Sequence, residues 1–391
     1  MRRWSQNIAV TLALAVACLL GTMQAGADSF NQKLRQAHEH LAAREYEKAV
    51  EVLEQLDRPD QDKAMAHRLL GYAYRQLGQN DKARASFVAA LSQGGLSPDT
   101  LDGLVQIDYE QDRQHTLLVG LGLRVLMSPT NTTWALAYAD ALTAGGRNDE
   151  ARNICETILK RSPHNARIYI CLGNAHLMDN AEKEAVGAFQ SAYWLGSHDS
   201  GLAARIAGLW HNLGNTKTSV RWYERAIKAD PGNSTSLRMR AAELRFANGD
   251  IEKAIGQLET LAQSTDNAVA GKALFMLGHA AIRKDRKAAA VEHFQEAMAK
   301  GYVQPDIVAY VAAHFIEQDK AEKAVSLIAE HKANLPFNAA IEHKLAFKLI
   351  ETNRLDLARH HLRRYMEHRG LDETAKRMLA MLSEAQTAQS Q

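Results

Sequence analysis

The sequence has little proline, cysteine or aromatic residue: 7 Pro and 3 Cys among 391 residues, with Phe, Trp and Tyr at 6%. So few cysteines exclude a small disulfide-rich scaffold, and so little proline excludes a collagen-like rod. An excess of charge of one sign is also missing, because 47 Lys and Arg residues face 45 Asp and Glu residues. This balance argues against nucleic-acid or anionic-membrane binding driven by overall charge. Hydrophobic residues, at 46%, are abundant enough for a large buried core.

Residues 1–27 have the composition of a leader. Two arginines precede an apolar run over residues 8–21, and residues 25–27 read Ala-Gly-Ala. This order is typical of a secretory signal peptide, and the run is shorter than the roughly 20 residues that a spanning helix needs. We expect cleavage after Ala27 and an exported, periplasmic chain. The alternatives are a membrane tether through an uncleaved anchor or through a lipid on Cys18.

The mature chain has no further stretch that approaches a membrane span. The leader also holds two of the 47 basic residues, so the mature chain is formally neutral. Any affinity for a partner must therefore come from local patterning of side chains.

Three segments of the chain, residues 67–90, 169–192 and 274–297, align without gaps. Each has Leu-Gly, then Ala twelve residues later, Phe four residues after that, and a final Ala after three more. The residues are Leu70, Gly71, Ala83, Phe87 and Ala90; Leu172, Gly173, Ala185, Phe189 and Ala192; and Leu277, Gly278, Ala290, Phe294 and Ala297. This pattern resembles the tetratricopeptide repeat (TPR), in which each repeat is a pair of antiparallel helices.

The same spacing extends to ten repeats. They start at residues 30, 64, 98, 132, 166, 200, 235, 271, 305 and 339. The resemblance implies an all-α fold, an α-solenoid wound as a right-handed superhelix over residues 28–372, in which neighbouring hairpins cover each other's apolar faces. Residues 373–391 are predicted to form a capping helix, with Ala375, Met378, Leu379 and Leu382 on one side, and a frayed tail.

The helix-breaking residues agree with these boundaries. All seven prolines lie between repeats, where they avoid the cost of about 3 kcal/mol that proline carries inside a helix. Gly78, Gly146, Gly214 and Gly249 lie in the turn between the two helices of a repeat, where glycine readily ends a helix. Nine repeats have Ala or Ser early in the second helix, but the third has Leu117, which leaves the distance or register of its two helices open.

The sequence lacks the motifs of an enzyme. We find no phosphate-binding glycine loop, Gly-x-Ser-x-Gly, His-Glu-x-x-His or Cys-x-x-Cys, and we expect neither enzymatic activity nor a cofactor nor a metal. His360, His361 and His368 have spacings of one and seven, whereas two ligands on one helix face need three or four. A solvated helix face is the interpretation that we favour for these histidines.

Cys155 and Cys171 fall in helices that pack directly against each other in the TPR family. The resemblance therefore implies that the pair can form a disulfide. The bond needs Cα atoms within about 7 Å, and two separate buried thiols are the interpretation that we favour.

The resemblance also implies a concave groove, lined by the first helix of each repeat, in which partners bind. Polar side chains at the groove positions suit hydrogen bonding to an extended peptide or to a helix, although each can also be merely solvated. These candidate residues are Asn174, His211, Asn212, Glu243, His279 and Arg283. The carboxylate clamp of TPR co-chaperones is absent, because no repeat has asparagine at its sixth position.

Together these features predict a non-enzymatic scaffold of the bacterial cell envelope. Its partners would be one or more envelope proteins of secretion, pilus assembly or exopolysaccharide assembly, and neither nucleic acid nor a membrane span is expected. The alternative is a carbohydrate-binding module of a polysaccharide export system. The scarcity of aromatic residues at the groove positions argues against this alternative. The oligomeric state stays open.

Overall fold

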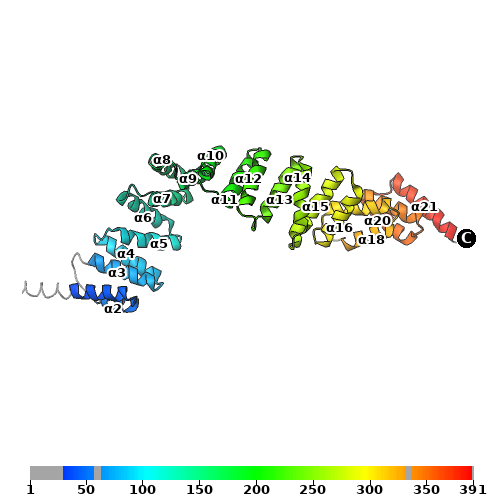
Figure 1. Cartoon of the computed structure of the whole chain (residues 1–391). Coiled ribbons are helices and arrows are strands. Elements are labelled where there is room, and N and C mark those ends of the chain that lie inside the picture. Colours follow the sequence, from blue (N-terminus) through cyan, green and yellow to red (C-terminus); the bar gives the residue numbers. More distant parts are fainter. Residues whose placement is uncertain (1–29, 57–62, 332–335, 390–391) are drawn as a thin grey trace, which may run out of the picture. The chain divides into compact units, whose positions relative to one another are not determined.

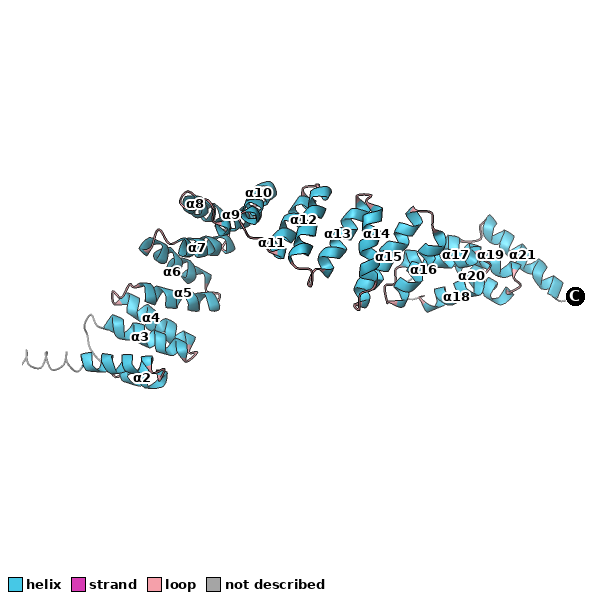
Figure 2. Cartoon of the chain, in the orientation of Figure 1, coloured by secondary structure: helices cyan, strands magenta, loops and turns pink. Residues whose placement is uncertain are grey.

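The computed structural model describes residues 30–56, 63–331 and 336–389, and within these ranges every regular element is an α-helix (Figures 1 and 2). The predicted all-α solenoid is confirmed. The predicted leader, with Cys18 and the cleavage site after Ala27, lies outside the described residues. The chain divides into two compact bodies, residues 1–197 and 198–391, here called the N-terminal and C-terminal bodies. In each, helices pair in sequence order, and we call the two members of a pair helix A and helix B.

The N-terminal body contains five such pairs among its described residues. They are residues 30–42 with α2 (Tyr46–Glu54), α3 (Lys63–Gln76) with α4 (Asn80–Ser92), α5 (Pro98–Glu110) with α6 (Gln114–Met127), α7 (Thr132–Ala144) with α8 (Asn148–Leu159), and α9 (Ala166–Met178) with α10 (Glu182–Trp194). Each helix B also packs on the next helix A, as α6 does on α7, and successive A helices such as α7 and α9 touch. This alternation places the A helices side by side.

The C-terminal body repeats the arrangement. Its pairs are α11 (Ser200–Asn212) with α12 (Thr216–Ala229), α13 (Thr235–Ala247) with α14 (Ile251–Ala262), α15 (Asn267–Arg283) with α16 (Lys287–Ala299), α17 (Pro305–Glu317) with α18 (Ala321–Glu330), and α19 (Ala339–Glu351) with α20 (Leu355–Arg369). Helix α21 (Glu373–Gln389) packs against α19 and α20. It buries Ala375, Met378 and Leu382, whereas Leu379 remains 38% exposed.

The turn between helix A and helix B always places one residue in the left-handed region, at the fifteenth position of the repeat. Four of these residues are the glycines that the sequence marks. The other six are Arg44, Asp112, Asn180, Asp285, Asp319 and Asn353, with φ between 52° and 59°. Asn and Asp adopt this conformation more readily than other non-glycine residues, because the short polar side chain bonds locally. The same tight turn therefore forms in all ten repeats, with or without glycine.

The twenty-fourth residue of each repeat, on helix B, fills the slot between neighbouring hairpins; we call it the ring position. Phe87, for example, packs so closely on helix A that a Cβ at Gly71 would lie 2.7 Å from its ring. The ring also reaches the sixth position of the next repeat, where a Cβ at Gly103 would lie 2.5 Å away. Phenylalanine at the ring position thus requires glycine at the eighth position, which we call the contact position.

The other two repeats with phenylalanine at the ring position obey the same rule, but the sixth repeat does not, because it pairs the larger Tyr223 with Ala207. Phe189 and Phe294 face Gly173 and Gly278. Where the contact position is alanine, the ring position holds Leu, Ile, Cys or Tyr. These pairs are Ala37 with Leu53, Ala139 with Cys155, Ala207 with Tyr223, Ala242 with Leu258, Ala312 with Ile328 and Ala346 with Leu362. The third repeat differs, because Val105 occupies its contact position and Leu121 its ring position.

Cys155 and Cys171 are joined in a disulfide between α8 and α9, with their Cα atoms 6.6 Å apart. The structure differs here from the two separate thiols favoured by the sequence. Cys155 occupies the ring position of the fourth repeat and Cys171 the sixth position of the fifth, the same two positions that Phe87 and Gly103 hold two slots earlier. A covalent bond therefore takes the place of a ring contact, and both residues are buried.

The interpretation of the last histidines as a solvated face is wrong for His361. This side chain is buried, and its Nδ1 lies 2.6 Å from Oε2 of Glu342. Arg364 binds the other oxygen of that carboxylate at 3.1 Å. The two partners together offset the desolvation penalty of burying the Glu342 carboxylate. His368 stacks on Phe337 at 3.9 Å.

Two further properties concern the described residues as a whole. No group of three or more His, Cys, Asp or Glu side chains among them could hold a metal ion. None of their helices is both long and apolar enough to cross a membrane.

Candidate partner-binding surfaces

The six candidate groove residues all lie on A helices, but the structure distributes them over both bodies. Asn174 is on α9 of the N-terminal body. The other five are in the C-terminal body: His211 and Asn212 on α11, Glu243 on α13, and His279 and Arg283 on α15. Asn174 and Asn212 already interact with neighbouring groups. His211 is half-buried, and its Nδ1 has no hydrogen-bond partner among the described residues.

Glu243 lies at the centre of an ion-paired surface on α13 and α15. Lys272 Nζ approaches one carboxylate oxygen at 2.6 Å, and Arg240 approaches the other at 3.0 Å. Burial raises the pKa of Glu243, but hydrogen bonds from Lys272 and Arg240 outweigh it and hold the pKa below its usual value. These residues border a shallow hollow of about 750 Å³. Its charges are already satisfied within the body.

His279 and Arg283 are likewise held by their neighbours. The His279 ring packs against Phe275 and Phe294, with centroids 4.5 and 5.3 Å apart, and its Nε2 lies 3.6 Å from Asp306. The Arg283 guanidinium lies 4.2 Å from the centroid of the Phe246 ring and donates to the Phe246 carbonyl at 3.2 Å. The structure therefore brings Glu243, His279 and Arg283 onto two touching helices, but as paired side chains.

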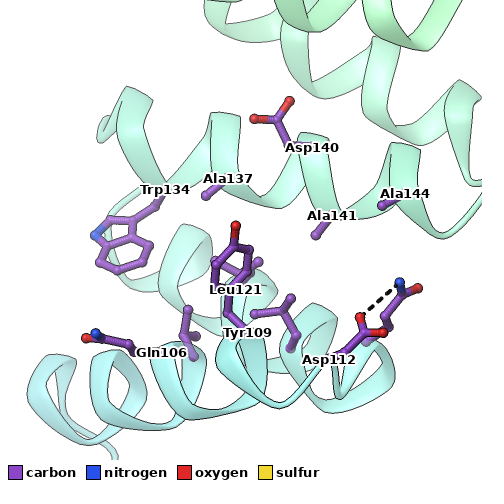
Figure 3. Close-up of a pocket in the computed structure, with 12 residues that line it drawn as sticks. Gln106, Tyr109, Asp112, Leu121, Trp134, Ala137, Asp140, Ala141 and Ala144 are labelled. Carbon is purple, nitrogen blue, oxygen red and sulfur yellow. Dashed lines mark hydrogen bonds between the residues drawn. The ribbon is translucent and has the colours of Figure 1, made fainter.

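A pocket that the sequence analysis did not identify opens in the N-terminal body, between α5, α6 and α7 (Figure 3). Its volume is about 530 Å³. The apolar part of its wall consists of Val105, Leu117, Leu121, Trp134, Ala137, Ala141 and Ala144. Tyr109, Gln106, Asp112, Gln114 and Asp140 supply the polar groups.

The pocket lies at the slot of the third repeat, where Val105 and Leu121 face α7. Val105 at the contact position is larger than the glycine or alanine of the other repeats, and Leu121 at the ring position is smaller than the phenylalanine of three of them. The facing residues of α7, Ala137 and Ala141, are also small. Leu117, the departure noted in the sequence, forms part of the wall. Two departures in one repeat, at Val105 and Leu117, are the sequence signal that could have located the site.

The residues of the pocket have a clear order (Figure 3). Trp134 lies at one end and Asp112 at the other, with the ring of Tyr109 between them, while Asp140 projects from α7 away from Tyr109. Tyr109 is 74% exposed, which is unusual for a large side chain beside an apolar wall. The guanidinium of Arg124 lies 4.6 Å from the Trp134 ring centroid and is ion-paired with Asp102 at 2.5 Å.

The two carboxylates at the pocket differ in their surroundings. Desolvation raises the pKa of Asp140, and the positive charge of Arg167 opposes this effect. Asp112 accepts a long hydrogen bond of 3.5 Å from Gln114. Neither carboxylate forms an ion pair within 4 Å among the described residues.

Comparisons with known proteins agree with this architecture. The family model for tetratricopeptide repeats matches residues 34–98, 136–201 and 239–305, together just over half of the chain. No curated protein sequence matches.

Among solved structures, a tetratricopeptide repeat protein from Parabacteroides merdae is 20% identical, over 64% of this chain and 98% of its own, with a TM-score of 0.42. YrrB, described as a TPR protein with an unusual peptide-binding site, is 18% identical over 50% and 97%, with a TM-score of 0.41. PilF of Pseudomonas aeruginosa is 16% identical over 56% and 99%, with a TM-score of 0.37.

Proposed function

Because the chain belongs to the tetratricopeptide repeat family, we propose that it is an interaction scaffold without enzymatic activity, which holds polypeptide segments of partner proteins on its A helices. The observation that carries this proposal is the open pocket of the N-terminal body. The ring position holds Leu121 here, as leucine does in three other repeats, but an apolar wall with open volume faces solvent beside an exposed tyrosine. Exposed apolar patches, and apolar pockets with a few polar groups, mark binding sites.

The proposed location is the bacterial cell envelope, after export. The leader pattern supports it, and so does the buried disulfide, since such bonds persist in oxidising compartments. The processes that fit are secretion, pilus assembly and exopolysaccharide assembly. Mass spectrometry of the mature N-terminus tests the export step: a chain beginning at Asp28 supports it, whereas an intact or lipidated N-terminus supports the tethered alternatives.

Site-specific photo-crosslinking in the producing cell tests the scaffold role. Benzoylphenylalanine in place of Tyr109 would stand at the pocket, and in place of Val119 it would stand on α6 of the same repeat, where the side chain is 54% exposed. We expect a discrete protein adduct at position 109 and none at position 119. Both variants have the same chemistry and sit in one hairpin, so the pair controls for expression and folding.

Two results would contradict the proposal. No adduct at position 109, or equal adducts at both positions, would mean that the pocket does not contact a partner protein. An adduct that consists of glycan without peptide would instead support the carbohydrate-binding alternative.

A further inference from the structure

The pocket between α5, α6 and α7 also indicates what kind of segment it receives, an inference that rests on the scaffold function. We propose that it takes one bulky apolar side chain, aromatic or leucine-like, from a partner segment that carries a lysine or arginine close to that side chain. The apolar residue enters the unfilled slot, and the basic residue pairs with the carboxylates at the rim.

The shape of the pocket carries the first half of this proposal. In the second, fifth and eighth repeats a phenylalanine of the chain occupies the equivalent slot, packed on glycine. In the third repeat Val105 prevents this, and a volume of about 530 Å³ stays open against Leu117 and Leu121. Tyr109 lines this open volume and is itself exposed, so the volume is accessible to a side chain from another molecule.

The charges around the pocket carry the second half. Among the residues that line it, Asp112 and Asp140 are the charged ones, and no Lys or Arg is among them. Nearby Arg124 is paired with Asp102, and Arg113 with Asp81 at 3.4 Å, so neither is left to neutralise the rim. Arg167 acts on Asp140 only through its longer-range charge. The rim is therefore acidic and complements a basic partner residue.

The direction of the segment follows from the positions of these groups. Asp140 projects from α7 away from Tyr109, while Asp112 lies at the far end from Trp134 (Figure 3). Gln106, Asp140 and Asn174 hold the same ninth position on α5, α7 and α9. A segment that crosses from α5 toward α9 would meet the apolar pocket first and Asp140 next. The basic residue is therefore expected within a few residues of the apolar one.

Selection from a phage-displayed library of random dodecapeptides on the full mature protein tests the proposal. We expect enriched peptides that combine Phe, Trp, Tyr, Leu or Met with a nearby Lys or Arg. Their fluorescein-labelled copies are then titrated by anisotropy against the protein and its variants. Enriched peptides that lack a bulky apolar residue would overturn the proposal.

Two variants with matched controls assign the binding to this pocket. Ala141→Leu fills the pocket and should weaken binding at least about tenfold, whereas Ala85→Leu on the exposed face of α4 should not. Asp140→Asn should weaken binding about threefold and reduce its salt dependence, whereas Glu184→Gln on α10 should not. Because Asp140→Asn leaves the volume of the side chain unchanged, it remains informative if Ala141→Leu perturbs folding.

The outcomes separate this inference from the scaffold function. Unchanged affinity in Ala141→Leu, with native circular dichroism, would overturn the pocket assignment even if crosslinking at position 109 captures a protein. Unchanged affinity and salt dependence in Asp140→Asn would overturn the requirement for a basic residue. A concentration-dependent dimer that Ala141→Leu abolishes would assign the pocket to a second copy of the chain, against the proposal.

Discussion

The slot around Phe294 in the C-terminal body and the pocket around Leu121 in the N-terminal body occupy the same place in the repeat, yet one is filled and the other is open. Phe294 packs on Gly278 and makes an edge-to-face contact with Tyr310, with centroids 5.5 Å apart. Leu121 faces Val105 and the small residues of α7 across about 530 Å³ of open volume. The two slots thus differ in the residue at the contact position, glycine in one and valine in the other, and in the open volume that remains beside it.

Removing the ring should have the largest effect. Phe294→Ala should lower the free energy of unfolding by about 3–5 kcal/mol, because it leaves a cavity among residues that cannot all collapse into it. Leu121→Ala should cost about 2–3 kcal/mol, at the lower end for a buried leucine, since its slot is already open on one side. Urea denaturation monitored by circular dichroism measures both. Equal losses would contradict the difference between the two slots.

The disulfide is a third way of filling the slot, and breaking it should have the next largest effect on the free energy of unfolding. Loss of the bond between Cys155 and Cys171 should cost about 3 kcal/mol, by the loop-entropy estimate for a separation of 16 residues. Thermal denaturation with and without reductant measures the effect. The double variant Cys155→Ala/Cys171→Ala serves as the control, because its melting temperature should not respond to reductant. Two reactive thiols in the unreduced, unfolded protein would show that the bond is absent.

Replacing a turn glycine by alanine should lower the free energy of unfolding by the same amount in both bodies. Gly78→Ala and Gly249→Ala each place a Cβ where nothing lies within 4 Å, at φ of 72° and 87°, so only the backbone conformation is penalised. We expect each to lower the free energy of unfolding by about 1 kcal/mol. Urea denaturation measures both losses. Unequal losses of unfolding free energy would mean that the hairpin turns of the two bodies also differ, and that the difference between the bodies is not confined to the slots.

The smallest effects on stability come from removing one carboxylate charge in each body, and the two changes should have opposite signs. The pKa of Asp140 is raised, so the folded state disfavours its charged form and loses stability as pH rises through the carboxylate range. Asp140→Asn should therefore be slightly more stable than the wild type at neutral pH and equal to it in acid. The pKa of Glu243 is lowered, so Glu243→Gln should be less stable at neutral pH, with the difference lost as pH falls.

Each difference should stay below about 1 kcal/mol, because the groups are partly exposed. Denaturation midpoints at neutral and acidic pH measure both variants beside the wild type. The same sign for both would contradict the contrast between an unpaired rim and an ion-paired surface.

Much of the fold could be predicted because it depends on local rules. Helix-breaking residues, small residues at helix crossings and the spacing of Leu-Gly and Phe are all visible in one repeat. The left-handed turn at Arg44 or Asp285 could not be seen, because these residues are not glycine and the hairpin imposes their conformation. The burial of His361 depends on Glu342, which lies on another helix and 19 residues away.

The pocket was missed for a related reason. Val105 is one more apolar residue on the buried side of a helix, and it stands out only when the eighth position is compared across all ten repeats. The candidate groove residues were selected for polarity, but polar side chains such as Glu243 and Arg283 are already held by neighbours, Glu243 by Lys272 and Arg283 by Phe246. The open site is instead apolar, and its presence follows from a missing ring.

The bond between Cys155 and Cys171 also changes how the N-terminal body can come apart. In a linear array each hairpin is held by its immediate neighbours, so unfolding can start at an end and spread one hairpin at a time. A covalent tie between α8 and α9 means that the fourth and fifth hairpins cannot separate in this way. Fraying that begins at residue 30 must stop there or break both hairpins together. The tie therefore acts as a barrier to progressive unzipping beside the repeat that carries the open pocket.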